Sequence, residues 1–182
     1  MRSRLPMTIV GVTLVLMLGI AGAACGDDDD TDGDGVTAPD AEAYYSDVDR
    51  IQNSLTEQLD AVSEQSDVAY GDPDKALTSL SAAENAGSAA LEDLQVLQAP
   101  SVAATAHGDL VFASEDLVAA LQQLIEDLAG IEEGPDFETF LADVLQPDSA
   151  YSQASEEMRD ACAKMQAAAD NSRVEIVFQC PV

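Results

Sequence analysis

Apolar side chains recur at spacings of three and four residues from residue 40 to about residue 170. Tyr44, Val48 and Ile51 show this spacing near its start. Such spacing places apolar residues on one face of an α-helix, where they can bury against a neighbouring helix. Strand-like alternation is not found before the last ten residues. The chain is therefore predicted to be all-α.

Proline and glycine divide this periodic region into helices. Asp72 and Pro73 predict a helix start, because Asp caps a first turn well and Pro suits the first helical position. That helix is expected to end at residues 99–100 (Ala-Pro), and a third helix to cover about residues 101–131. The Gly-Pro pair at residues 134–135 is its stop signal.

In the last third of the chain, the pattern predicts two helices that together form the fourth side of a helical bundle. A short helix around residues 137–144 is broken at Pro147, and a longer one continues from Tyr151 toward residue 170. Short connections favour an up-down bundle of about four helices over residues 40–182. Residues 174–182 read VEIVFQCPV, which is too rich in β-branched side chains for a helix and predicts an extended C-terminal tail.

The periodicity also predicts which residues face inward. In the first helix Asp47 and Gln52 fall on the side opposite the apolar residues, and we expect them to face solvent. In the second helix the inward positions include the small residues Ala83, Ala86 and Gly87. Their lack of bulk predicts a close approach of the neighbouring helix at that level.

Residues 1–24 have the three-part layout of an export signal. Arg2 and Arg4 are followed by an almost unbroken apolar run over residues 7–20 and by small side chains at residues 21–24. A basic start, an apolar centre and a small-residue end are typical of a cleaved signal peptide. The domain that follows is therefore predicted to lie outside the cytoplasmic membrane.

Cys25 directly follows Ala-Gly-Ala-Ala at residues 21–24. This arrangement resembles the lipobox of bacterial lipoproteins, in which the cysteine thiol is acylated and becomes the mature N-terminus. The family usually has Leu three positions before the cysteine, and this chain has Gly22. The resemblance implies a lipid anchor, such as palmitate, on Cys25. The alternative is cleavage after Ala23 or Ala24, which would release a soluble secreted protein.

A second resemblance concerns the helical region. The run from Leu94 and Leu97 through Ala99-Pro100 to His107 and Leu110 is similar to uncharacterised bacterial extracytoplasmic helical-bundle proteins. This resemblance implies a helical-bundle fold and no particular activity.

Residues 25–39 lack apolar side chains that could form a core, and their charges repel one another. Such a segment is predicted to be a disordered tether. Its alternating carboxylates also match the first half of a calcium-binding loop: Asp28, Asp30, Asp32 and Asp34. The twelfth loop position is Pro39, where a bidentate Glu belongs. The tether is the preferred interpretation, and a calcium site is the alternative.

Acidic residues number 35 and basic residues 7. Removing Arg2 and Arg4 with the signal would leave five basic residues, a net charge of −30. Such a charge repels phosphate backbones and anionic lipid headgroups, so we expect no nucleic-acid partner. Basic or cationic envelope partners are favoured. The acidity can alternatively serve solubility or a high-salt habitat.

Cys162 and Cys180 are the two cysteines outside the predicted lipid site. An exported protein meets an oxidising compartment, where thiols pair. The extended tail is long enough to return past the end of the last helix. A disulfide between them is predicted, and two separate thiols are the alternative.

The chain contains one histidine, His107, which excludes multi-histidine metal sites and diiron sites of the Glu-x-x-His type. His107 falls on the inward side of its helix, and we interpret it as a structural, hydrogen-bonded residue rather than a base. Met158, Cys162 and Met165 share a helical face and carry soft ligands that suit Cu(I). The same spacing is what core packing requires, and packing is the preferred interpretation.

The sequence contains no nucleophile elbow, no glycine-rich phosphate loop and no haem-attachment motif. No catalytic residue and no cofactor is therefore expected. The preferred hypothesis is a membrane-anchored, non-catalytic binding or scaffolding module. The alternatives are a calcium or copper handler and a carboxylate-based enzyme.

Overall fold

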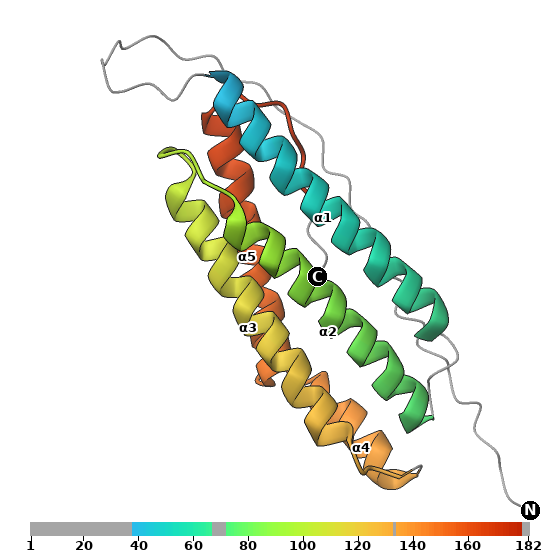
Figure 1. Ribbon diagram of the computed structural model, residues 1–182. Helices are drawn as coiled ribbons and strands as arrows, with labels where there is room; N and C mark the ends of the chain where they lie inside the picture. The colour runs from blue at the N-terminus through green and yellow to red at the C-terminus, as the bar shows by residue number, and fades with distance from the viewer. Residues whose placement is uncertain (1–37, 67–71, 133, 180–182) are drawn as a thin grey trace, which may run out of the picture. The chain divides into compact units, whose positions relative to one another are not determined.

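The computed structural model describes residues 38–66, 72–132 and 134–179, which all belong to one unit, Gly35–Val182. The helices of this region are α1 (Ala38–Ser66), α2 (Pro73–Val96), α3 (Ala104–Leu128), α4 (Pro135–Val144) and α5 (Ala150–Asn171). Helices α1, α2, α3 and α5 run antiparallel in turn, and the short α4 lies at one end of them (Figure 1). The described residues contain no strand. The predicted all-α up-down bundle is confirmed, with α5 as its fourth long helix and the short α4 at one end.

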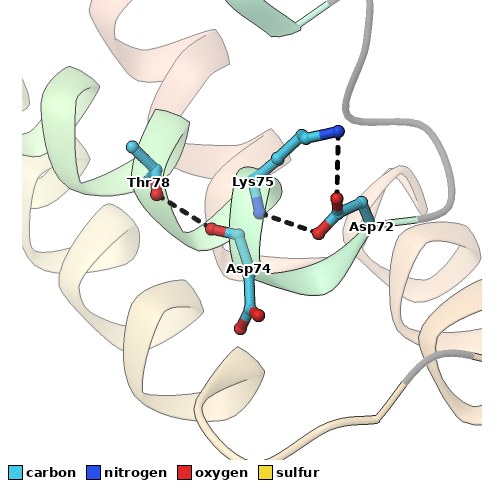
Figure 2. A network of polar contacts seen from close by, with 4 residues as sticks. All are labelled: Asp72, Asp74, Lys75 and Thr78. Atoms are coloured by element: carbon cyan, nitrogen blue, oxygen red, sulfur yellow. Dashed lines mark hydrogen bonds and ion pairs between the residues drawn. The ribbon is translucent and has the colours of Figure 1, made fainter.

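The start of α2 shows why the chain turns into a helix at this point. Oδ1 of Asp72 accepts a hydrogen bond from the backbone N–H of Lys75 at 3.2 Å, and Oδ2 lies 3.1 Å from Nζ of Lys75 (Figure 2). These hydrogen bonds to Lys75 hold the pKa of Asp72 below its usual value. In the next turn, Oγ1 of Thr78 donates to the carbonyl oxygen of Asp74. The predicted N-cap is confirmed.

The connection between α2 and α3 is longer than predicted. Helix α2 ends at Val96 and α3 begins at Ala104, where we expected the boundary near residues 99–101. Leu97 already has an extended backbone, with φ −70° and ψ 136°. A proline has no N–H for the carbonyl four residues before it and its ring clashes with that carbonyl, so Pro100 ends the helix at Val96. The chain then turns once, with the N–H of Ala103 donating to the carbonyl of Pro100 at 2.9 Å.

The core is built by facing stripes of α1, α2, α3 and α5. Its largest fully buried side chains are Tyr45, Phe137, Leu110, Leu128, Met165, Val48 and Cys162. Helix α2 contributes mainly small residues, among them Ala86 and Ala90. A Cβ added to Gly87 would lie 3.3 Å from Cγ2 of Val118 on α3. The predicted close approach at this level of α2 is therefore confirmed.

Helix α5 ends in a reversal that sends the chain back along the bundle. Arg173 has a left-handed backbone, with φ 56°. The N–H of Val174 donates to the carbonyl of Ala169, and the N–H of Arg173 to the carbonyl of Asp170. This pair of hydrogen bonds is a Schellman motif, in which glycine is the usual left-handed residue. The motif satisfies carbonyl groups that the end of the helix would leave unpaired.

The extended tail packs against the helices instead of leaving them. The side chain of Gln166 donates to the carbonyl of Ile176 at 2.8 Å and accepts from the N–H of Phe178 at 2.9 Å. The ring of Phe178 is buried, and its centroid lies 6.3 Å from that of Tyr45. The predicted extended C-terminal tail is confirmed over residues 174–179.

The outer faces of the helices carry acidic side chains and few basic ones. Three ion pairs occur in the described region, and all are exposed: Arg50–Asp47, Lys75–Asp72 and Lys164–Asp109. Within the same region, no helix is both long enough and apolar enough to cross a membrane.

Candidate functional site

His107 lies in α3 and faces α1. Its Nδ1 is 2.9 Å from the hydroxyl of Tyr44, and the two rings meet edge to face with centroids 5.8 Å apart. Burial lowers the pKa of His107, which favours the neutral imidazole. Burial, with a smaller effect of Tyr45, raises the pKa of Tyr44, so that the hydroxyl keeps its proton. A half-buried, hydrogen-bonded pair of neutral groups favours the structural interpretation of His107.

Met158, Cys162 and Met165 all lie on the buried face of α5, with exposed fractions of 5%, 0% and 0%. Nε2 of Gln52 donates to Sγ of Cys162 at 3.3 Å, and the hydroxyl of Tyr44 lies 4.0 Å from Sδ of Met165. These contacts are those of a packed core, which favours packing over the copper alternative. In the part of the chain that the structure describes, no group of three His, Cys, Asp or Glu side chains could hold a metal ion.

Several predicted site residues lie outside the described residues. They are Cys25, the four carboxylates Asp28, Asp30, Asp32 and Asp34, and Cys180. The lipid anchor, the calcium alternative and the disulfide therefore stay predictions. What the structure adds is that Phe178, two residues before Cys180, is held against the bundle by Gln166 of α5.

Gln52 was expected to face solvent, and this expectation was wrong. Its side chain is 5% exposed and lines a narrow, largely apolar cavity of about 50 Å³ between α1, α2, α3 and α5. Among the described residues, its Oε1 has no hydrogen-bond partner. The signal that we missed is its position four residues after Val48 and three before Leu55, which continues the apolar spacing.

A larger apolar pocket of about 290 Å³ opens at the end of the bundle that carries α4. All five helices line it, including Val62 of α1, Leu80 of α2, Leu124 of α3, Phe140 of α4 and Tyr151 of α5. Ligand sites are typically concave and mostly apolar, with a few polar groups that fix orientation. We call this hollow the apolar pocket.

A second hollow of about 270 Å³ adjoins the apolar pocket and differs from it in charge. Leu124, Phe140, Val144 and Tyr151 line both. The second hollow adds two carboxylates, Asp127 of α3 and Asp143 of α4, together with Gln123 and Ser149. We call it the acidic pocket. Sequence reasoning had singled out neither carboxylate, because α3 and α4 bring together residues that are far apart in the helical pattern.

Both carboxylates lie where a helix least favours an acid. Asp127 is in the last turn of α3 and Asp143 in the last turn of α4, and neither turn contains a basic residue. The end of a helix carries partial negative charge from its unpaired carbonyl groups. Gln123 donates one hydrogen bond to Asp127, at 2.8 Å. The acidic pocket therefore concentrates negative potential beside two aromatic rings.

Comparison of the chain with protein families, with curated proteins and with solved structures found no match.

Proposed function

We propose that this chain is a lipid-anchored extracytoplasmic protein that acts as a non-catalytic binding module for basic or cationic partners. The observation that carries the binding part is the excess of carboxylates on the exposed faces of the bundle. Of the basic side chains, Arg50, Lys75 and Lys164 are already paired with acids. Most carboxylates are therefore available to attract cations from solution.

The anchoring part rests on the N-terminal sequence. Residues 1–24 have the layout of an export signal, and Cys25 follows the small residues that precede an acylated cysteine in bacterial lipoproteins. Two or more acyl chains would make the attachment stable, whereas one chain gives only reversible binding. A role without catalysis is supported by the engagement of the single histidine, His107, with Tyr44.

A disulfide between Cys162 and Cys180 is part of the proposal. Closing this loop is expected to contribute about 3 kcal/mol by restricting the unfolded chain. The buried position of Cys162 and the docking of the tail at Phe178 support it. The protein is unfolded in denaturant, treated with or without reductant and then alkylated; mass analysis should show two extra alkyl groups only in the reduced sample.

Cell fractionation of a Cys25→Ala variant tests the anchor. The wild-type chain is expected in the membrane fraction, and the variant is expected to leave it, because the site of acylation is lost. A Cys162→Ala/Cys180→Ala double variant is the matched control and should stay with the membrane. Equal membrane association of wild type and Cys25→Ala, when mass analysis shows that residues 1–24 are removed from both, would contradict the anchor.

Binding of an oligolysine peptide to the full chain tests the choice of partner. We expect binding that weakens as salt is added, because the attraction between opposite charges is screened. An oligoglutamate peptide of equal length should not bind. Binding of both peptides alike, or of neither, would contradict the proposed preference for cations.

A further inference from the structure

The apolar and acidic pockets share a wall but differ in what they can hold. Both hollows are bordered by the same four residues, so they lie next to each other: Leu124, Phe140, Val144 and Tyr151. The apolar pocket offers aliphatic and aromatic side chains from five helices. The acidic pocket offers two carboxylates at its polar side. This combination is complementary to a molecule with an apolar part and a positively charged part.

Asp127 and Asp143 lie in the last turns of α3 and α4, next to helix ends that carry partial negative charge. Gln123 donates one hydrogen bond to Asp127, and no ion pair to either carboxylate is present among the described residues. A bound cation would therefore be attracted by both carboxylates and by both helix ends.

The aromatic rings narrow the choice of cation. Phe140 and Tyr151 line both pockets, and aromatic rings attract organic ammonium groups through their electron-rich faces. A small, strongly hydrated metal ion would not use the rings or the apolar pocket. An anionic amphiphile such as a fatty acid would meet the two carboxylates and be repelled.

We propose that the apolar and acidic pockets together bind an organic cation with an apolar tail, such as an alkylammonium compound. The tail fills the apolar pocket, and the ammonium group lies between Asp127 and Asp143 beside Phe140 and Tyr151. This inference rests on the proposed function, because it names the class of cation that the binding module takes and the place where it binds.

Calorimetric titration of the full chain in lipid nanodiscs, with empty nanodiscs as the blank, tests the site. The probe is hexyltrimethylammonium, and its matched controls are tetramethylammonium, hexanol and hexanoate. We expect the probe to bind at least about tenfold more tightly than tetramethylammonium, because each buried methylene adds favourable transfer energy. Hexanol should bind more weakly than the probe, and hexanoate should not bind.

Variants distinguish binding at the two pockets from attraction by the negative charge of the whole surface. Asp127→Asn with Asp143→Asn is expected to weaken probe binding by about tenfold, since two attractive charges are lost. Ser79→Leu places a larger side chain into the apolar pocket. It should weaken binding of the probe but leave binding of tetramethylammonium unchanged. Glu156→Gln with Glu157→Gln, on exposed positions of α5, removes the same charge elsewhere and should leave binding unchanged. Thermal unfolding of each variant establishes that it is folded.

Three results would overturn the proposed site. The first is that hexanol binds as tightly as the probe. The second is that the Glu156→Gln/Glu157→Gln control weakens probe binding as much as Asp127→Asn/Asp143→Asn does. The third is that the probe does not bind at all. If oligolysine still binds in the last case, the site is wrong and the proposed function stands. If the probe binds but Cys25→Ala stays membrane-bound, the anchor is wrong and the site stands.

Discussion

The amide of Gln52 sits in the core with its Nε2 bonded to Cys162 and its Oε1 unpaired among the described residues. A buried polar atom without a partner costs about 1–3 kcal/mol of stability. The unpaired oxygen of Gln52 is therefore expected to lower the free energy of unfolding.

Replacing Gln52 by Met keeps the length of the side chain and removes the unpaired oxygen. We expect the free energy of unfolding to rise by about 1 kcal/mol, since the gain exceeds the loss of one weak N–H···S hydrogen bond. Urea unfolding measures the change. Gln58→Met on the exposed side of α1 is the control, with an expected effect below about 0.5 kcal/mol. Destabilisation of Gln52→Met beyond the control would mean that the amide is needed.

His107 makes stability depend on pH in a defined window. Its pKa in the folded protein lies below 6.5, the value expected when it is exposed, so the unfolded chain binds the proton more readily. Stability from this residue is therefore fully present above pH 6.5 and lost as the pH falls from 6.5 toward the folded pKa.

Comparing wild type with His107→Gln isolates this effect from the titration of the many carboxylates. The difference in unfolding midpoint between the two proteins should be constant above pH 6.5. Below pH 6.5 the midpoint of the wild type should fall relative to that of the variant. A difference that does not change across this window would show that His107 is not held neutral by burial.

At the scale of elements, two glycines inside helices differ in what surrounds them. A Cβ at Gly108 of α3 would meet nothing within 4 Å, whereas a Cβ at Gly87 of α2 would meet Val118 at 3.3 Å. Alanine is favoured over glycine inside a helix by about 1 kcal/mol.

Gly108→Ala should therefore raise the free energy of unfolding by about 1 kcal/mol. Gly87→Ala has the same intrinsic gain, but Val118 must give way, so its net effect should be clearly smaller or negative. Urea unfolding of both variants gives the comparison directly. Equal stabilisation of the two would show that α2 and α3 are not in close contact at Gly87.

The helices themselves followed from sequence because their signals are local. The period of the apolar residues and the cap at Asp72 act within one or two turns. The Gly-Pro pair at residues 134–135 was assigned wrongly as the stop of the third helix: α3 already ends at Leu128, and Gly134 and Pro135 begin α4 as its N-cap and first residue. The boundaries around Pro100 were misplaced by three to four residues, since the influence of a proline on the preceding helical turn was underweighted. The division of the following region into α4 and α5 was predicted correctly from Pro147.

The candidate site could not be predicted in the same way. Asp127 and Asp143 belong to different helices, and their shared pocket depends on how α4 lies against α3 and α5. Gln52 follows the apolar spacing but was assigned by its polarity alone. Helical periodicity identifies a face of one helix, whereas a pocket requires the placement of several.

At the scale of the whole molecule, the net charge of −28 opposes compaction. Like charges on a folded surface repel one another more than in the expanded chain. Salt shortens the range of this repulsion, from about 10 Å at 0.1 M to about 3 Å at 1 M.

We therefore expect the midpoint of thermal unfolding to rise steadily with added sodium chloride, and equally with potassium chloride. Equal effects of the two salts indicate screening. Calcium chloride at equal ionic strength is the third arm, because specific binding would raise the midpoint at low concentration. A midpoint that falls with sodium chloride would contradict a repulsion-limited stability.

The intact mass of the protein extracted from membranes tests export and lipid attachment together. We expect a chain that lacks residues 1–24, begins at Cys25 and carries the added mass of acyl chains. A chain that begins at an unmodified Met1 and is recovered from the cytosol would contradict export, anchoring and the proposed place of action together.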